Sequence, residues 1–182
     1  MRFRFSNAFA PTLAGRRTNA LKFIVNMLVD LDTWSFDPAT HDEALAKAHL
    51  SATQGQSAAP ADARWIKDTF AGSWSQEASD GWNWFVRDGT GAAVGFATYE
   101  QRVTRFWWLA DWLDRPDIGI FGPMGIDPAL QGRNIGSVVA QKALLSLKEK
   151  GFAQAIIPAV GPVGFYERCC GARIVQRLSR ED

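Results

Sequence analysis

Runs of apolar residues divide the chain into segments with the periods of strands and helices. The clearest is a β-hairpin over 82–100, where two alternating runs flank the turn residues 88–91 (DGTG). Further apolar runs predict strands. These lie at 21–31, 118–127, 152–160 and 172–178. The strand at 118–127 is unusual because glycines and Pro123 interrupt it, which is typical of a bulge or of backbone that meets a ligand.

Apolar residues at helical spacing predict helices between these strands. The clearest covers 137–151, with Val139, Ala143 and Leu147 on one face and Gly151 as its end. The other predicted helices cover 37–52, 63–76 and 162–171. Two segments remain: 53–62 is expected to be a loop of small residues, and 101–117 a loop or a short helix.

The order of these segments predicts an α/β fold on a mixed sheet. Residues 118–160 read as strand, glycine-bearing loop, helix and strand, which is one right-handed βαβ crossover. No internal repeat is visible, so residues 21–182 are expected to form a single domain. Residues 1–20 are expected to be an N-terminal arm or an edge strand, since MRFRF alternates like a strand.

Composition and charge exclude several classes of protein. A hydrophobic fraction of 47% and a charged fraction of 21% are those of an ordinary globular chain. The net charge of +1 gives no reason to expect nucleic acid or a membrane surface as partner. No apolar run approaches the roughly 18 residues of a membrane span. Cys169 and Cys170 are adjacent, which disfavours a disulfide and indicates small buried residues in a reducing, cytoplasmic setting.

The loop before the clearest helix is longer than a simple turn requires. It reads QGRNIG over residues 131–136. A helix N-terminus carries unpaired N–H groups and a partial positive charge, so it binds phosphate readily. Gly132 and Gly136 let the backbone approach a ligand closely, Asn134 tolerates a positive φ, and Arg133 adds a mobile charge. The loop therefore predicts a phosphate seat, and the alternative is a β–α turn with glycines for packing.

This loop, the helix after it and the later stretch FYERCCGAR resemble the acetyl-CoA signature of the GNAT superfamily of N-acyltransferases. The family pattern is Gln or Arg, two residues, Gly, one residue, then Gly or Ala. Gln131 and Gly136 match its ends, whereas Asn134 replaces the middle glycine and can adopt the same backbone region. The resemblance covers residues 118–178, and the hairpin fits the family's strand order.

The resemblance implies a mixed, mostly antiparallel central sheet with a splayed acetyl-CoA-binding strand pair and helices on both faces. Acetyl-CoA would be the co-substrate, with its pantetheine arm along strand 121–127 and its pyrophosphate on the N–H groups of 131–137. The residues implied in cofactor binding are Met124, Gly125, Ile126, Gln131, Gly132, Arg133, Asn134, Ile135, Gly136, Ser137 and Phe165. The N–H of Gly125 or Ile126 would also meet the thioester carbonyl.

Acyl transfer from a thioester requires a deprotonated amine, a stabilised oxyanion and a stabilised thiolate. The resemblance gives Tyr166 the last role, and the alternative is a half-buried tyrosine bonded to backbone. Glu100, after the second hairpin strand, is the candidate base acting through water, or merely a solvated glutamate. The aspartates of the segment 101–117 would bind a cationic amine or be solvated. These are Asp111, Asp114 and Asp117.

Two further groups of residues have open roles. Trp107, Trp108 and Trp112 would wall an acceptor pocket, pack the loop down or form a dimer contact. His41 and His49 lack a second ligand type at a useful spacing, so we assign no metal.

The leading interpretation is an acetyl-CoA-dependent N-acetyltransferase that acts on a primary amine of a small molecule or peptide. The alternatives are a non-catalytic acyl-CoA-binding or sensing module and an aromatic-rich interaction protein. After the last helix the chain has room for one strand, where many family members have a two-strand hairpin. We expect residues 1–5 or 21–31 to fill the vacant edge, within the chain or across a homodimer.

Overall fold

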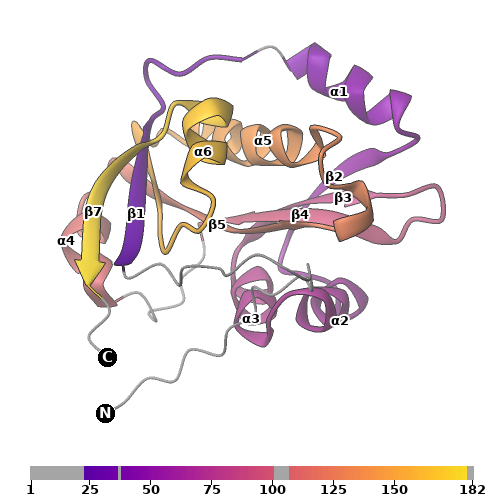
Figure 1. The fold of residues 1–182 in the computed structure, drawn as a ribbon, viewed down its shortest axis with the longest axis horizontal. Coiled ribbons are helices and arrows are strands. Elements are labelled where there is room, and N and C mark those ends of the chain that lie inside the picture. Colours follow the sequence, from indigo (N-terminus) through magenta and orange to yellow (C-terminus); the bar gives the residue numbers. More distant parts are fainter. Residues whose placement is uncertain (1–22, 37, 101–106, 180–182) are drawn as a thin grey trace, which may run out of the picture.

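A seven-stranded sheet, in the order β2-β3-β4-β5-β6-β1-β7, forms the centre of the fold (Figure 1). The computed structural model describes residues 23–36, 38–100 and 107–179. The expected arm or edge strand at 1–20 lies outside these residues. The strands are β1 (Phe23–Asp30), β2 (Ser51–Gln56), β3 (Trp82–Arg87), β4 (Ala93–Tyr99), β5 (Ile118–Ile126), β6 (Gln154–Ile157) and β7 (Arg173–Ser179). All neighbouring strands pair antiparallel except β5 and β6, which are parallel.

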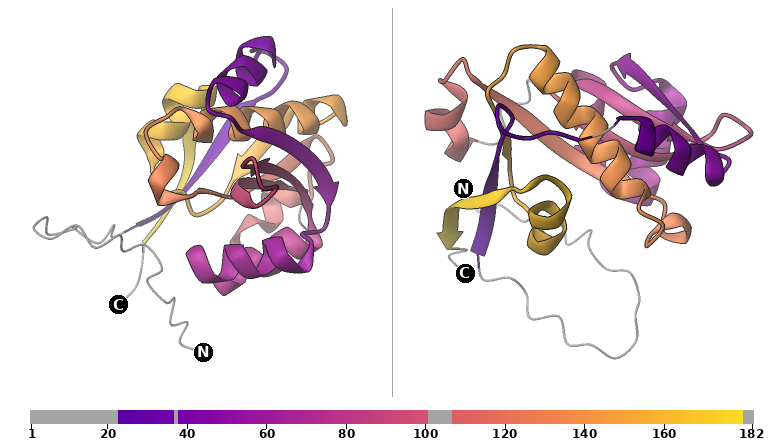
Figure 2. Two further views of the ribbon diagram at one scale, coloured as in Figure 1. Left: turned by 90° about the vertical axis from the view of Figure 1, so that its right-hand side faces the viewer. Right: turned by 90° about the horizontal axis from the view of Figure 1, so that it is seen from above.

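Helices cover both faces of this sheet (Figures 1 and 2). They are α1 (Pro38–Lys47), α2 (Pro60–Thr69), α3 (Gly72–Asp80), α4 (Ala110–Leu113), α5 (Ile135–Glu149) and α6 (Val163–Cys170), with 3₁₀ turns η1 (Trp107–Leu109) and η2 (Pro128–Leu130). α1, α5 and α6 lie over one face, and α2, α3 and α4 over the other. The expected mixed, mostly antiparallel sheet with helices on both faces is confirmed. Among the described helices, none has the length and apolar character to cross a membrane.

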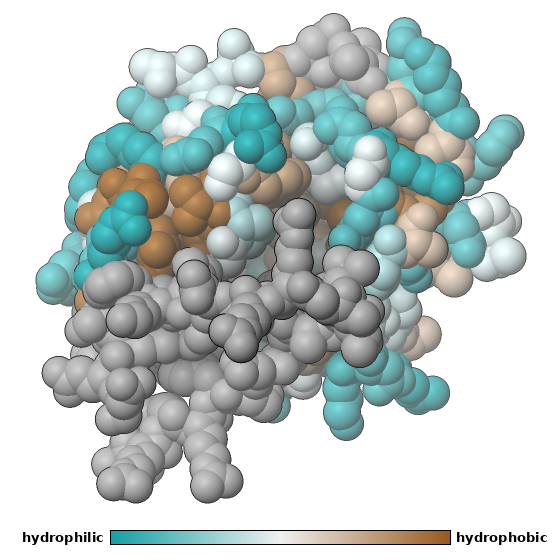
Figure 3. Space-filling model, in the orientation of Figure 1, coloured by the Kyte–Doolittle hydropathy of each residue, from teal (hydrophilic) through white to brown (hydrophobic). Residues whose placement is uncertain are grey.

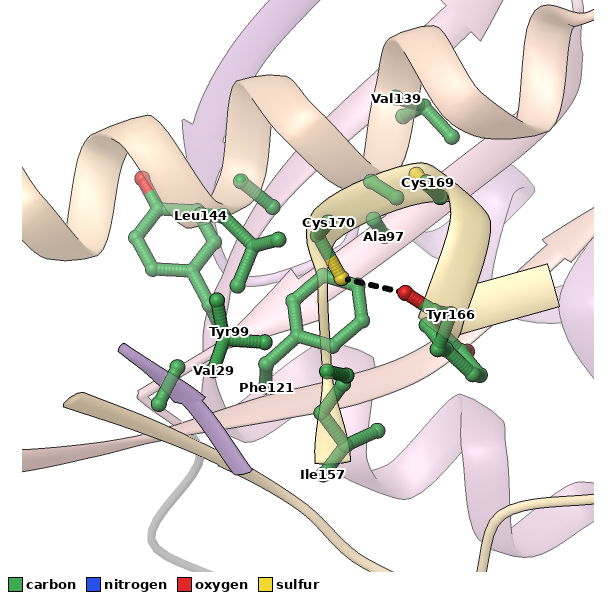
Figure 4. Close-up of a cluster of buried hydrophobic side chains, with 14 of the residues drawn as sticks. Val29, Ala97, Tyr99, Phe121, Val139, Leu144, Ile157, Tyr166, Cys169 and Cys170 are labelled. Carbon is green, nitrogen blue, oxygen red and sulfur yellow. Dashed lines mark hydrogen bonds between the residues drawn. The ribbon is translucent and has the colours of Figure 1, made fainter. Parts of the chain in front are cut away.

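Alternation along the strands sends side chains into separate clusters on the two faces. Met27 and Ala97 pack with α5, whereas their neighbours Leu28 and Phe96 belong to clusters on the opposite face. The cluster under α5 also holds Tyr99 and Phe121, and Figure 4 shows several of its side chains. Hydrophobic side chains also reach the surface on the side where β7 lies (Figure 3), and β7 is an edge strand.

The predicted loop at 53–62 is wrong, because residues 51–56 form the edge strand β2. This strand pairs with β3 from Ser51 opposite Arg87 to Gln56 opposite Trp82. Most of its residues are exposed, so it lacks the alternation of apolar residues that marks a half-buried strand. The pairing with β3, not the local sequence, makes this segment a strand.

The single helix predicted at 63–76 is also wrong. Two helices, α2 and α3, cover 60–80, and the chain is extended at Ala71 between them. At this break the ring of Phe70 packs with Phe96 of β4 at a centroid distance of 5.8 Å. The break between α2 and α3 therefore coincides with a contact between Phe70 and the sheet. The helical spacing of apolar residues gives no sign of such a contact.

The strand predicted at 21–31 completes the sheet within the chain. As β1 it pairs with β6, with Met27 opposite Ile157, and with β7, with Asn26 opposite Gln176. It lies between these strands instead of at an edge of the sheet. The alternative segment 1–5 lies outside the described residues.

Replacing Leu144 by Ala should destabilise the protein strongly. Leu144 of α5 is fully buried in the cluster of Figure 4, and deleting a buried leucine costs about 2–5 kcal/mol of unfolding free energy. Leu145→Ala, on a half-buried position of the same helix, should cost clearly less. Urea denaturation of both variants measures the difference, and equal losses would contradict the packing described here.

Candidate active site

A cleft opens where β5 and β6 separate. The two strands pair only from Ile118 to Ile120, while β4 stays beside β5 up to Ile126. Residues 122–126 therefore have no strand partner on the β6 side among the described residues. The cleft has a volume of about 1000 Å³. Its walls are β5, residues 131–137 at the start of α5, the loop 158–162, α6, Phe70 after α2, and part of α3. An unpaired strand edge offers N–H and C=O groups to an extended ligand.

Most of the residues that the sequence assigns to cofactor binding line this cleft. They are Met124, Gly125, Ile126, Gln131, Gly132, Asn134, Gly136, Ser137 and Phe165. The two others point elsewhere: Arg133 is exposed and is not among the lining residues, and the side chain of Ile135 is buried in the core with 1% exposure. Ile135 can therefore contribute its backbone but not its side chain.

The loop before α5 presents its amides to the cleft. Within the described part of the chain, the backbone N–H groups of residues 132–137 donate to no protein acceptor. Asn134 has φ 64° and ψ 3°, the positive φ that the sequence predicts, and Gly132 has φ 80°. A Cβ at Gly136 would lie 3.6 Å from Ile126 and Phe165, an ordinary contact, so packing does not require glycine there. This geometry favours an anion seat over a turn with glycines for packing.

Side chains fix the position of this loop. Asp127 accepts a hydrogen bond from the N–H of Ala129 at 2.9 Å, which caps η2. Gln131 donates from Nε2 to the carbonyl of Ile126 at 3.3 Å and so ties the loop back to β5. Gln131, which matches the first position of the family pattern, thus has a structural role in addition to any contact with a ligand.

The opposite wall of the cleft depends on Asn26, which the sequence reasoning missed. Asn26 is fully buried in β1, accepts from the N–H of Ala159 at 2.9 Å and donates to Gln176 Oε1 at 2.7 Å. The N–H of Val160 donates to the carbonyl of Val25 at 2.7 Å. These bonds hold the loop after β6 away from β5. The signal in the sequence is a single amide side chain inside an otherwise apolar strand.

Tyr166 of α6 lies in the cleft with 7% exposure. Its ring makes edge-on contacts with Phe121 and Phe165, at centroid distances of 6.1 and 4.9 Å. Burial, together with the nearby Cys170 and Cys169, raises the pKa of the Tyr166 phenol. The hydroxyl therefore stays protonated and able to donate a hydrogen bond at neutral pH.

The two cysteines of α6 are free and buried. Cys170 Sγ donates to the carbonyl of Tyr166 at 3.2 Å, the dashed line of Figure 4. Cys169 lines the cleft, and its Sγ lies 3.8 Å from the carbonyl of Ser137. Gln141 Nε2 donates to the carbonyl of Cys169 at 2.6 Å, so α6 is anchored to α5 beside the amide seat.

Glu100 is not among the residues that line the cleft. Its carboxylate pairs with Lys150 after α5, and both line a separate polar depression with Trp82. The Lys150 ammonium lies 4.4 Å from the centre of the Trp82 ring. The role as base that the sequence assigns to Glu100 stays a prediction.

The segment 107–117 packs against the sheet, and none of its described side chains is among the residues that line the cleft. Trp108 and Trp112 lie against Ile118 and Ile120, which favours packing over an acceptor pocket. The side chain of Trp107 lies outside the described residues. Asp117 is paired with Arg115 at 2.6 Å, a contact that lowers the pKa of Asp117. Asp111 and Asp114 are exposed.

The sequence reasoning also missed three residues of α2–α3 that line the cleft. They are Phe70, Trp74 and Glu77. Glu77 is 1% exposed, and it is the one acidic side chain among the described residues of the cleft. The signal is the spacing of Trp74 and Glu77, which puts both on one helix face. Among the described residues, no group of three or more His, Cys, Asp or Glu side chains could hold a metal ion.

Residues 46–172 match the acetyltransferase (GNAT) family, which is more than half of the chain. The chain belongs to the GNAT family of acetyltransferases. This membership supports acyl transfer as the class of reaction. A search of curated proteins found no match.

Solved structures agree on the fold. The GCN5-related glucosamine N-acetyltransferase region of a fungal multi-domain GH3 β-N-acetylglucosaminidase has a TM-score of 0.65 at 16% identity, over 86% of this chain and 20% of that chain. A putative GNAT acetyltransferase from Novosphingobium aromaticivorans has a TM-score of 0.54 at 15% identity, over 87% and 63%. A GNAT N-acetyltransferase from Escherichia coli, solved with CoA, has a TM-score of 0.50 at 16% identity, over 66% and 68%. The chain thus covers only part of the first two relatives, 20% of the length of the first and 63% of the length of the second.

The burial of Tyr166 has a measurable consequence. The chain has two tyrosines, so Tyr166 is the one phenol that remains in a Tyr99→Phe variant. In the folded variant the phenol should not ionise near pH ~10, its ordinary pKa, because burial raises the pKa. Since the unfolded chain then ionises first, the free energy of unfolding should fall as the pH rises above ~10.

Near-ultraviolet absorbance during an alkaline titration measures this ionisation. The same variant in guanidinium chloride is the control and should titrate near pH ~10. A folded protein that titrates at the same pH as the unfolded control would contradict the burial of Tyr166.

Proposed function

We propose that this GNAT chain is an N-acetyltransferase that uses acetyl-CoA and transfers the acetyl group to a primary amine of a small molecule or peptide. The observation that carries the proposal is the row of unused amides at residues 132–137, next to an unpaired strand edge. Together they fit a ligand with a diphosphate at one end and an amide-bearing arm at the other. Coenzyme A has both.

In this proposal, the N–H groups of 132–137 hold the pyrophosphate at the start of α5. The partial positive charge of the helix end strengthens this binding. The free groups of β5 at 124–126 pair with the amides of the pantetheine arm as a neighbouring strand would. Arg168, exposed at the cleft, adds a positive charge on the same side. Phe165 packs beside Gly136 and closes the seat.

The reaction is direct attack of the amine on the thioester. The amine nitrogen forms a bond to the carbonyl carbon, the carbon–sulfur bond breaks, and the CoA thiolate leaves. An N–H of Gly125 or Ile126 stabilises the oxyanion, and Tyr166 donates a hydrogen bond to the thiolate. The raised pKa of the Tyr166 phenol lies above that of a thiol. The phenol therefore keeps its proton and stabilises the thiolate through a hydrogen bond. Glu100 is the sequence-based candidate for the base.

A non-catalytic acyl-CoA sensor is the second candidate. It is favoured by the position of Glu100, whose carboxylate is paired with Lys150 outside the cleft. A thiol-release screen of acetyl-CoA against amines, amino acids, aminoglycosides and peptides separates the two functions. An enzyme releases thiol with at least one acceptor, and a sensor releases none above hydrolysis.

Replacing Gly136 by Trp should abolish cofactor binding. The indole would fill the seat between Ile126 and Phe165, and we expect affinity for acetyl-CoA to fall by roughly 100-fold or more, ~3 kcal/mol. Isothermal calorimetry measures the affinity. Gly136→Ala is the matched control, since its Cβ makes ordinary contacts, and it should bind nearly as the wild type does. Wild-type protein without affinity for acetyl-CoA would overturn the proposal.

Replacing Tyr166 by Phe should lower turnover and leave cofactor binding intact. The variant keeps the ring contacts with Phe121 and Phe165 and loses the hydroxyl. A hydrogen bond to a charged group is worth about 1.5–3 kcal/mol, so kcat should fall about 10- to 100-fold. Steady-state thiol release gives kcat, and calorimetry gives the affinity for acetyl-CoA. Unchanged kcat would remove Tyr166 from the mechanism.

A further inference from the structure

Gly125 of β5 leaves a space beside the strand that the ring of Phe70 fills. Gly125 lies opposite Phe96 of β4, so a side chain at 125 would point to the same face of the sheet as the Phe96 ring. That face is the one covered by α2 and α3 (Figures 1 and 2). A Cβ at Gly125 would lie 2.5 Å from the Phe70 ring, closer than packed atoms come. The place of a strand side chain is therefore taken by the residue that follows α2.

Neighbouring aromatic rings hold Phe70 in this place. Trp65 meets its ring edge-on, with a centroid distance of 5.5 Å and an interplanar angle of 89°. Trp74 stacks on it at a centroid distance of 5.5 Å, and Phe96 lies 5.8 Å away. The same apolar cluster includes Ile66, which is fully buried. The Phe70 ring therefore belongs both to an apolar cluster and to the wall of the cleft, which it lines.

The cleft connects the two faces of the sheet through the opening between β5 and β6. Tyr166 lines it from the cluster under α5, whereas Phe70 lines it from the opposite face. In the proposed reaction, the thioester sulfur meets Tyr166, and the carbonyl oxygen accepts from the N–H of Gly125 or Ile126. An N–H···O bond is about 2.9 Å long, so the carbonyl carbon then lies beside the backbone of β5. Because the three bonds of a carbonyl carbon point apart, the acyl chain leaves it in the direction of Phe70.

We propose that Phe70 limits the acyl group of the thioester to the size of an acetyl group. This inference rests on the proposed function and adds the residue that selects the acyl donor. The methyl group of acetyl-CoA ends at the ring, whereas the further methylenes of a longer acyl chain require the ring to move. Such a movement is costly, because Trp65, Trp74 and Phe96 pack against the ring and a well-packed apolar cluster has no room for it.

A pair of probes that differ in acyl length alone tests this role without requiring turnover. The probes are acetyl-CoA and butyryl-CoA, which share the nucleotide and the pantetheine arm and differ by two methylenes. We expect the wild-type protein to bind butyryl-CoA about 10-fold more weakly or worse, since overpacking of an apolar cluster carries a penalty of this order. Calorimetry without an acceptor measures both affinities. Equal affinities, or tighter binding of butyryl-CoA, in the wild-type protein would overturn the proposal without any variant.

Phe70→Ala should remove this preference by strengthening the binding of butyryl-CoA. The vacated space is apolar, and each methylene buried there is worth roughly 4-fold in affinity, so butyryl-CoA should gain about 10-fold or more over the wild type. Phe70→Leu keeps a smaller apolar side chain and should give an intermediate result. Phe85→Ala is the matched control, because Phe85 is a buried ring of the same cluster that does not line the cleft, and it should keep the preference. Retention of the full preference by Phe70→Ala, or an equal loss in Phe85→Ala, would overturn the proposal.

Refilling the space from the strand provides an independent measurement. In the Phe70→Ala protein, the further change Gly125→Ala places a methyl group at the point that the ring occupies in the wild type. The affinity for butyryl-CoA should then fall again by roughly 4-fold or more, the value of one buried methylene. An unchanged affinity for butyryl-CoA in the double variant would mean that the acyl chain does not lie beside Gly125, and it would overturn the proposal.

The affinity of the wild-type protein for acetyl-CoA distinguishes the two levels of inference. If the wild-type protein does not bind acetyl-CoA, the proposed function fails. If it binds acetyl-CoA and butyryl-CoA equally well, the role of Phe70 alone fails.

Discussion

The separation of β5 from β6 is the constraint on which the rest of the structure depends. A sheet that opens in its middle leaves backbone N–H and C=O groups unpaired, and such groups are costly when buried. Proline occurs on both sides of the opening, as Pro123 within β5 and Pro158 directly after β6. Because proline lacks an N–H group, neither residue can donate a ladder hydrogen bond, although β5 itself continues beside β4 to Ile126. A residue that cannot donate to a ladder thus follows the last β5–β6 pair in both strands.

The opened edges are held apart from both directions. On one side, Asn26 and Val25 of β1 bind the loop after β6 through backbone groups of Ala159 and Val160. On the other, β4 pairs with β5 up to Ile126, and Gln131 ties the helix-initiating loop to the end of β5. The cleft is thus preformed by interactions that no ligand contributes. A preformed cleft lowers the ordering cost of binding.

Sequence patterns correctly predicted those features of the fold that depend on residues close together in the sequence. The turn at 88–91, the amphipathic face of α5 and the positive φ of Asn134 each follow from a few neighbouring residues, and each is observed. β2 and the break between α2 and α3 escaped prediction because distant contacts decide them: β2 is an exposed edge paired to β3, and Phe70 reaches across to Gly125. Glu77 was missed for the same reason. Only the tertiary fold brings α3 to the cleft, because β5, the start of α5 and α6 come much later in the sequence.

The two ends of the cleft are lined by different kinds of group. The seat before α5 consists of backbone amides, whose positions depend on φ and ψ values, so an asparagine can stand at 134 where the family pattern has glycine. A site made of backbone amides requires few particular side chains. It is therefore compatible with the 14–16% sequence identity between this chain and solved structures that share its fold. The α2–α3 wall works instead through side chains, where one substitution changes charge or shape.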